Sequence, residues 1–248
     1  MRRLREAFKR STRRALARFG YELRRVNPWT SAQRHPSYVE RQEAGPVNLK
    51  DKLARQERGE PFEWPDIVAL NQTVATMRGS ARNIVELGGG TGTFAWHATQ
   101  DPTVVVTCSE FDAQAHEWAV KHRSRSNLRY VNGPVSPDQG PFDLAVAIEV
   151  IEHLTDFAGF LHVCAALAPR AIITTPNKLR SLQTATAGPP HYYQHVREWT
   201  AGEFYWVLRA HYDRVQLYAM PEPSRVGAIP ITVMSELSPV IAICERDA

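Results

Sequence analysis

The sequence predicts an α/β protein with a doubly wound, mostly parallel sheet of seven strands and a helical extension at the N-terminus. Three observations lead to this fold class. The length of 248 residues suits one α/β domain. From residue 83 onward, short apolar runs rich in β-branched residues alternate with helical stretches. Two long connections, 177–199 and 220–238, follow expected strands, and such connections in parallel sheets carry sites.

The expected strands are the apolar runs at 83–87, 103–109, 127–132, 142–148, 170–175, 213–219 and 239–244. The expected crossover helices lie at 92–100, 112–124, 155–167 and 200–211. Before them, the polar and proline-rich segment 27–80 predicts a linker and a helical cover, with helices near 48–58 and 66–78. The expected division is therefore an arm at 1–26, the linker and cover at 27–80, and the main domain at 81–248.

The N-terminal arm is strongly basic. Residues 1–25 carry ten Arg or Lys and two Glu, whereas the rest of the chain carries 20 basic and 24 acidic residues. Apolar residues from Leu4 to Leu23 recur at helical spacing, which predicts a basic amphipathic helix. Three partners suit such a helix: the acidic body of this chain or of a second copy in a homodimer, an anionic membrane surface, and nucleic acid.

The sequence favours a cytoplasmic protein, with the arm as a peripheral contact at the inner face of the membrane. The chain has no run of 18 apolar residues, and the arm lacks the pattern of a signal peptide. Cys108, Cys164 and Cys244 are widely spaced and lie in apolar runs. This arrangement predicts reduced core cysteines and no disulfide framework.

A glycine loop lies between the first expected strand and helix, in IVELGGGTGTF at 84–94. Gly88, Gly90 and Gly92 have the spacing G-x-G-x-G, and Glu86 precedes the first of them by two positions. Glycine allows tight turns and a close approach to a ligand. Thr93 replaces the third glycine of the dinucleotide fingerprint, which disfavours NAD. The segment resembles motif I of the class I S-adenosylmethionine-dependent methyltransferases.

This resemblance implies a cofactor site for S-adenosyl-L-methionine at Glu86, Gly88, Gly90, Gly92, Glu110 and Phe111. Glu110 ends the second expected strand, 18 residues past Gly92, where the family keeps an acid for the two ribose hydroxyls. A carboxylate suits this role because its two oxygens can accept two O–H donors. Phe111 would flank the adenine. A glycine-rich turn can also serve packing, but Glu110 at this distance argues against that reading.

A second constellation follows the fourth expected strand. Glu149, Glu152 and His153 are spaced i, i+3 and i+4, so a helical turn would bring them to one face. A divalent cation would neutralise the two carboxylates. The alternative is a metal-free site in which His153 forms hydrogen bonds or acts as a base.

Further motifs extend this constellation. TTPN at 174–177 and HVREWTAGEF at 195–204 complete a set that resembles the small-RNA 3′-terminal 2′-O-methyltransferases and, more loosely, bacterial sugar and natural-product O-methyltransferases. The resemblance spans about 83–210 and implies Mg²⁺ or Mn²⁺ bound by Glu149, Glu152, His153 and His195. It also implies catalytic roles for Glu152, His153 and His195. The metal would chelate neighbouring hydroxyls while a histidine accepts a proton.

The expected acceptor is a hydroxyl of a sugar, a polysaccharide precursor or another polyhydroxylated metabolite, and the alternative is the 2′-hydroxyl of an RNA 3′ end. Basic residues are sparse between 128 and 204, although RNA binding needs phosphate contacts. The arm's last residues, 19–25, also resemble the openings of bacterial methyltransferases of polysaccharide synthesis. A third possibility, a catalytically inactive binding module, conflicts with the intact loop and metal set. Aromatic residues that could stack on a sugar or belong to the core are Tyr192, Tyr193, Trp199, Phe204, Tyr205 and Trp206.

Overall fold

The computed structural model describes residues 47–181 and 194–247. The expected arm at 1–26, the linker residues 27–46, and Tyr192 and Tyr193 lie outside the described residues. Residues Pro46–Ala248 form one compact unit. Within the described ranges, no helix has the length and apolar character needed to cross a membrane.

The described residues form one eight-stranded sheet in the order β3-β2-β1-β4-β5-β8-β6-β7. The strands are β1 (Asn83–Leu87), β2 (Val105–Glu110), β3 (Leu128–Asn132), β4 (Leu144–Ala147), β5 (Arg170–Thr175), β6 (Arg214–Ala219), β7 (Ile229–Pro230) and β8 (Val240–Glu245). Neighbours from β3 to β5 are parallel, and β8 runs antiparallel between β5 and β6. The predicted fold class and its seven strands are confirmed. The short β7 was not predicted, because two residues paired with the end of β6 leave no periodic pattern.

The two helices expected in the cover, before β1, and the four expected between the strands are also present. They are α4 (Val47–Glu57), α5 (Pro65–Thr76), α6 (Thr93–Ala98), α7 (Ala113–His122), α8 (Phe157–Leu167) and α10 (Ala201–Arg209). Local signals explain their starts: the Asp112 side chain accepts hydrogen bonds from two amides of α7, and Thr200 and Glu203 form a capping box on α10. The short α9 (Lys178–Ser181) and the 3₁₀ turn η1 (Pro137–Gln139) were not predicted, and the 3₁₀ turn η2 (Ile151–His153) covers only the end of the helical turn considered for 149–153.

Apolar side chains pack against both faces of the sheet because successive strand residues point to opposite sides. On β1, Ile84 joins the cluster under α5 and α6, whereas Val85 joins the cluster under α8 and α10. All three cysteines are buried and free, as predicted: Cys108 lies in the first cluster, and Cys164 and Cys244 lie in the second. The strands of the central sheet are therefore buried on both faces.

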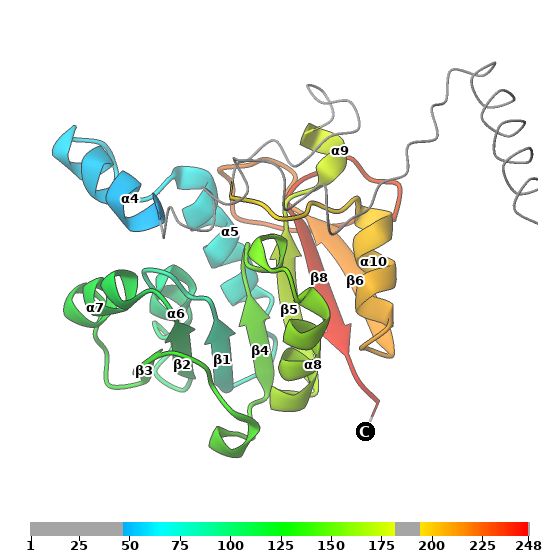
Figure 1. The fold of residues 1–248 in the computed structure, drawn as a ribbon, viewed down its shortest axis with the longest axis horizontal. Coiled ribbons are helices and arrows are strands. Elements are labelled where there is room, and N and C mark those ends of the chain that lie inside the picture. The colour runs from blue at the N-terminus through cyan, green and yellow to red at the C-terminus, as the bar shows by residue number, and fades with distance from the viewer. Residues whose placement is uncertain (1–46, 182–193, 248) are drawn as a thin grey trace, which may run out of the picture. The chain divides into compact units, whose positions relative to one another are not determined.

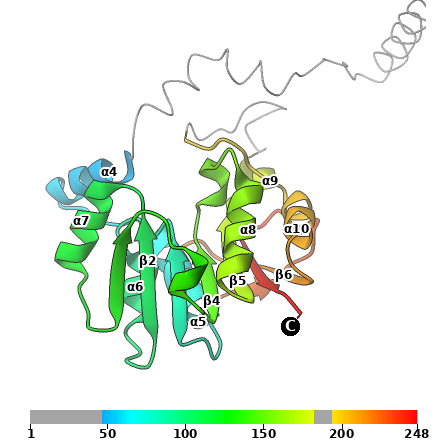
Figure 2. The ribbon, with the colours of Figure 1, turned by 60° about the horizontal axis from the view of Figure 1, so that its bottom comes forward.

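The parallel strands bring several loops to one edge of the sheet, which is the upper edge in Figure 1. The chain leaves β1 and β4 in opposite directions along the sheet, so these neighbours form the topological switch point. The glycine loop follows β1, Glu110 ends β2, η2 follows β4, and Asn177 follows β5. Helix α4 lies above α7 near this edge in both views (Figure 1 and Figure 2).

Candidate active site

The glycine loop turns through left-handed backbone conformations at Gly88 (φ 71°), Gly90 (φ 56°) and Gly92 (φ 75°). A Cβ at Gly88 would lie 2.8 Å from Val150 Cγ2, and one at Gly92 would lie 2.6 Å from the Tyr130 hydroxyl oxygen. A Cβ at Gly90 would meet no described atom within 4 Å. Packing and backbone conformation therefore require Gly88 and Gly92, whereas Gly90 opens toward space that a ligand can fill.

Glu110 is bonded directly to this loop. Its Oε2 accepts a hydrogen bond from the Gly90 amide at 2.6 Å, and its Oε1 accepts one from the Asp112 amide at 2.8 Å. Each carboxylate oxygen has a second lone pair, so Glu110 can also accept bonds from a ligand's hydroxyls. The next residue, Phe111, is 70% exposed. Its ring is therefore accessible to a planar group bound beside Glu110.

Glu86 lies beneath the loop. Its side chain is buried, its Oε2 accepts a hydrogen bond from the Ala95 amide at 3.2 Å, and a Cβ at Gly89 would collide with both Glu86 and Cys108. Burial raises the pKa of Glu86 to about 8, although hydrogen bonds from Cys108 and Ala95 oppose the shift. The structure therefore places Glu86 under the loop, where it supports the backbone at Gly89 and Ala95.

Three of the four expected metal ligands converge after β4. Potential ligand atoms of Glu152, His153 and His195 lie within 4.8 Å of one another. The backbone brings these distant segments together, because the Glu152 carbonyl accepts hydrogen bonds from the Val196 and Arg197 amides at 2.8 and 3.1 Å. We refer to Glu152, His153 and His195 as the EHH cluster.

Hydrogen bonds orient both imidazoles in the EHH cluster. His195 Nδ1 lies 2.7 Å from Glu198 Oε1, and His153 Nδ1 lies 3.0 Å from the Gln194 carbonyl oxygen. In the neutral rings, each Nδ1 is then the donor and each Nε2 carries the lone pair. Metal-binding histidines commonly have such a partner on the second ring nitrogen. Sequence reasoning did not assign a role to Glu198, although its i, i+3 spacing from His195 is a usable signal; the Gln194 carbonyl gives none.

Glu152 is the carboxylate of the cluster and is fully buried. Its Oε2 lies 3.3 Å from the Thr175 hydroxyl, and its Oε1 has no hydrogen-bond partner among the described residues. Burial, followed by repulsion from Glu149, raises the pKa of Glu152 well above its usual value. A cation at this position would satisfy the orphaned oxygen and stabilise the ionised carboxylate.

Glu149, the fourth expected ligand, does not belong to the EHH cluster. It has a positive φ of 54° and precedes the three-residue turn η2, so the helical spacing used to group it with Glu152 does not apply. Its amide and carboxylate both bond the Thr174 hydroxyl, at 3.0 and 2.8 Å. The donors that converge are thus one carboxylate and two imidazoles, a set that suits Mn²⁺ or Fe²⁺ better than Mg²⁺, which prefers oxygen ligands.

The aromatic segment mostly belongs to the core. Trp199 and Phe204 are fully buried, so neither is available to stack on a sugar, whereas Trp206 is exposed. The backbone of Trp199 pairs with the chain after β5, where its carbonyl accepts a hydrogen bond from the Lys178 amide at 2.8 Å. These contacts fix the segment that carries His195.

Sequence reasoning also missed a group of charged residues on the other side of the glycine loop. Lys52 and Glu63 are buried, and both bond Thr91, at 2.8 Å in each case. Arg123 donates a hydrogen bond to the Thr91 carbonyl at 3.0 Å. No motif marks these residues in the sequence, because they come from three separate segments.

Comparisons with known proteins agree with this architecture. Residues 47–211 match the family model described as "Methyltransferase domain". No match was found among curated proteins. The methyltransferase domain of bacterial CtHen1 is 22% identical, with a TM-score of 0.57, over 74% of this chain and 100% of that one.

Two further solved structures have the same fold. The plantazolicin methyltransferase BpumL in complex with SAH is 12% identical, with a TM-score of 0.57, over 88% of this chain and 93% of that one. The N-terminal domain of EvdMO1 with SAH bound is 12% identical, with a TM-score of 0.52, over 75% of this chain and 82% of that one. At these identities the likeness establishes the fold.

Proposed function

The chain belongs to the methyltransferase domain family, and on this premise we propose that it is an S-adenosylmethionine-dependent O-methyltransferase assisted by a divalent metal. Its proposed acceptor is a hydroxyl of a sugar, a polysaccharide precursor or another polyhydroxylated metabolite. Two structurally similar proteins with SAH bound support the choice of cofactor. The open space over Gly90, beside the Glu110 carboxylate, also fits this choice.

One geometric feature carries the proposal: the glycine loop and the EHH cluster share one edge of the sheet. They are close neighbours, because Gly88 packs against Val150, which precedes Glu152 by two residues. An acceptor held at the EHH cluster would therefore lie beside a cofactor held by the loop. Proximity of this kind lowers the barrier of a two-reactant step.

The residues of the EHH cluster suit activation of a hydroxyl. When bound, S-adenosylmethionine supplies an electrophilic methyl group, and a divalent metal supplies charge that lowers the pKa of a hydroxyl. Glu152, His153 and His195 would hold the metal. The buried Glu152 Oε1, which has no hydrogen-bond partner among the described residues, is the observation that favours a metal here. In a metal-free site, solvent-exposed His153 would accept the hydroxyl proton at Nε2, because its Nδ1 is bonded to the Gln194 carbonyl.

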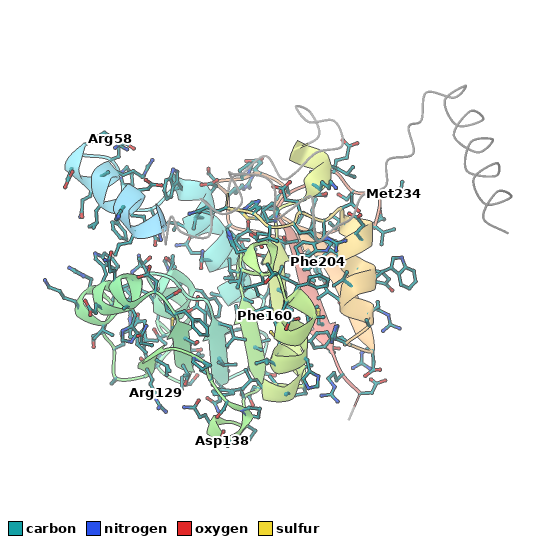
Figure 3. The ribbon with its side chains drawn as sticks, in the orientation of Figure 1. Arg58, Arg129, Asp138, Phe160, Phe204 and Met234 are labelled. Atoms are coloured by element: carbon teal, nitrogen blue, oxygen red, sulfur yellow. The ribbon has the colours of Figure 1, made fainter. Side chains whose placement is uncertain are left out.

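The charge distribution favours a sugar over RNA. Among the basic residues between 128 and 204, Arg129 lies at the edge of the sheet opposite the site, near Asp138 (Figure 3). Arg170 begins β5, and its guanidinium is bonded to the Met77 and Arg78 carbonyls. Neither arginine can contact a phosphate at the EHH cluster, which leaves, among the described side chains, Lys178 and Arg197 on that side: the Lys178 amide bonds the Trp199 carbonyl and the Arg197 amide bonds the Glu152 carbonyl. An RNA 3′ end remains the second candidate, because its vicinal diol and the motif resemblance suit the same cluster.

A methyl-transfer screen tests both candidates. The full chain is incubated with S-adenosylmethionine carrying a labelled methyl group and with either vicinal-diol sugars or short RNAs. Each acceptor is tested in EDTA, and then with Mn²⁺, Mg²⁺ or Fe²⁺ restored. Metal-dependent labelling of a sugar oxygen is the expected result, and labelling of RNA alone would select the second candidate.

Two substitutions and a control connect activity to the cluster. His195→Ala and Glu152→Gln are expected to lower turnover more than cofactor affinity, because these side chains act on the acceptor. His162→Ala, an exposed histidine on α8, is the matched control. Full activity in chelator with no bound metal would refute metal assistance, and a product labelled on nitrogen or sulfur would refute O-methylation.

A further inference from the structure

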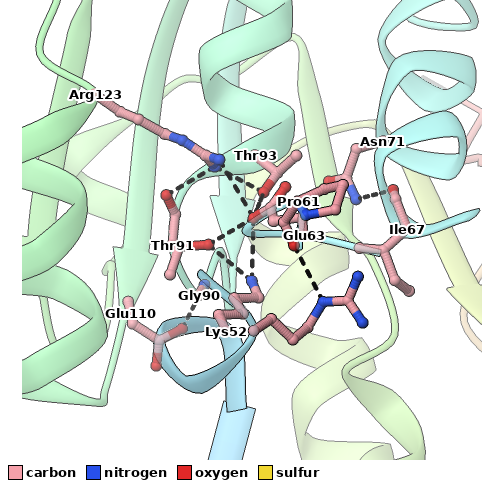
Figure 4. Close-up of polar contacts among 11 residues, drawn as sticks. Lys52, Pro61, Glu63, Ile67, Asn71, Gly90, Thr91, Thr93, Glu110 and Arg123 are labelled. Carbon is pink, nitrogen blue, oxygen red and sulfur yellow. Dashed lines mark hydrogen bonds and ion pairs between the residues drawn. The ribbon is translucent and has the colours of Figure 1, made fainter. Parts of the chain in front are cut away.

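A buried ion network ties the segment 47–64, which we call the cover segment, to the glycine loop (Figure 4). Lys52 Nζ donates hydrogen bonds to Glu63 Oε1 at 3.1 Å and to Thr91 Oγ1 at 2.8 Å. Arg123 lies on the other side of the carboxylate, with Nη2 3.3 Å from Glu63 Oε1, and its Nη1 donates to the Thr91 carbonyl and to Thr93 Oγ1. Both threonine hydroxyls donate to Glu63 Oε1. One carboxylate oxygen thus gathers two cations and two loop hydroxyls.

The centre of the network, Lys52 and Glu63, is buried. Lys52 is 4% exposed and Glu63 is 5% exposed. Phe62 stacks on Trp118 with a centroid separation of 4.2 Å, and the Lys52 ammonium and the Arg123 guanidinium lie over these two rings. In such surroundings the interactions between charges are strong and their geometry is well defined. Although burial opposes it, attraction by Lys52 and Arg123 holds the pKa of Glu63 at about 2.

The network acts on the part of the chain that most needs external support. Gly88, Gly90 and Gly92 have left-handed conformations, and glycine restricts the backbone little. Thr91 and Thr93 alternate with these glycines, and the network bonds both hydroxyls and the Thr91 carbonyl. The Gly90 amide, which precedes Thr91, donates a hydrogen bond to Glu110. The loop is therefore fixed between Glu110 and the ion network.

A role in fold stability does not explain this arrangement well. Burying charges carries a large desolvation cost, and apolar side chains of similar size commonly stabilise a protein as much as a buried ion pair does. What an ion network adds is a defined geometry at the atoms that it bonds. Here those atoms belong to the glycine loop.

We propose that Lys52, Glu63 and Arg123 are positioning residues that hold the glycine loop in its cofactor-binding conformation. Through Lys52 and Glu63, the cover segment then supports the cofactor site. This inference rests on the proposed function, in that the ligand of the loop is S-adenosylmethionine. None of the three residues needs to touch the cofactor, because each acts through Thr91 or Thr93.

The test uses two variants and a matched control. Glu63→Gln removes the charge at the centre of the network. Thr91→Val removes one loop hydroxyl with little change in shape, and it decides the question if Glu63→Gln does not fold. Glu60→Gln is the control, because Glu60 lies three residues away on the cover segment and pairs with Arg55 and Arg58 at the surface.

Two measurements are made on the full chain. Hydrogen exchange of residues 88–93 in the cofactor-free protein reports on the loop itself, and calorimetry reports S-adenosylmethionine and SAH affinity. Both variants are expected to exchange faster in 88–93 and to bind the cofactor about tenfold more weakly, because the binding-competent conformation is less populated. The control is expected to match the wild type in both measurements.

Other outcomes would overturn either the positioning role or the proposed cofactor. Wild-type exchange in 88–93 and wild-type affinity in both variants would refute the positioning role. Equal changes in all three variants would show that the substitutions act through the general stability of the cover segment, and would contradict a specific positioning role. Failure of the wild type to bind either ligand would refute the proposed cofactor, whereas loop exchange would still measure what the network does.

Discussion

Substitutions at three glycines distinguish the effects of backbone strain, of side-chain packing and of lost space for the cofactor. Gly59, Gly90 and Gly92 have φ values of 75°, 56° and 75°. A Cβ would meet no described atom within 4 Å at Gly59 or Gly90, but would lie 2.6 Å from the Tyr130 hydroxyl at Gly92. The three positions therefore share one backbone strain and differ in what surrounds them.

The expected stability losses follow from this geometry. A left-handed alanine costs about 1–2 kcal/mol, so Gly59→Ala and Gly90→Ala should each lower the unfolding free energy by about that amount. Gly92→Ala must also displace Tyr130, whose hydroxyl donates to the Arg123 carbonyl. Overpacking adds about 1–3 kcal/mol and a weakened hydrogen bond about 1 kcal/mol. We therefore expect a loss of roughly 3–6 kcal/mol for Gly92→Ala.

Chemical denaturation measures these losses, and calorimetry with S-adenosylmethionine measures the functional effect. Gly59→Ala should bind the cofactor normally because Gly59 belongs to neither the glycine loop nor the ion network. Gly90→Arg should retain the fold and lose binding, because its side chain would fill the space over the loop. If Gly90→Arg binds the cofactor as well as the wild type, the cofactor does not lie over Gly90. If Gly92→Ala is as stable as Gly59→Ala, the contact with Tyr130 does not constrain the loop.

Three further predictions concern other parts of the protein. Because the pKa of Glu86 is raised to about 8, the folded state retains a proton that the unfolded state releases. The free energy of unfolding should therefore fall between about pH 4.5 and 8, by at most about 1.4 kcal/mol per pH unit. Urea midpoints of Glu86→Gln should lack this slope, and an unchanged slope would contradict the assignment. Glu198→Gln removes the carboxylate partner of His195 and should weaken Mn²⁺ binding, measured by calorimetry, about 10- to 100-fold; equal affinity in His162→Ala, Glu198→Gln and the wild type would count against it. Removal of residues 1–26 should preserve turnover on a soluble acceptor and abolish binding to anionic vesicles in a flotation assay, and loss of cofactor binding would instead give the arm a structural role.

The sequence predicted the parts of the fold that follow from repeated local patterns. Apolar runs located the strands, and the G-x-G-x-G spacing located the loop that Glu110 contacts. Glu149 lies outside the EHH cluster because a single left-handed residue before η2 breaks the assumed helical spacing, and its role as a metal ligand stays a prediction. A backbone conformation of this kind leaves no trace in residue periodicity.

The ion network could not be predicted because its members are distant in sequence and ordinary in type. Lys50 and Lys52 lie on the same polar helix, yet Lys50 is exposed and Lys52 is buried against the glycine loop. Only the contacts of Lys52 with Glu63 and Thr91 distinguish them. Glu198 was within reach of sequence reasoning, because a carboxylate three residues after a candidate ligand can orient its ring.

The two halves of the proposed site, the glycine loop and the EHH cluster, are fixed by different interactions and should therefore respond to different substitutions. Side chains from outside the sheet fix the glycine loop through Thr91, whereas backbone hydrogen bonds to Glu152 fix the segment that carries His195. The two halves meet where Val150 packs against Gly88. Substitutions in the ion network should therefore act first on cofactor affinity and substitutions near Glu198 first on the metal and acceptor, while a larger side chain at Val150 should disturb both at once.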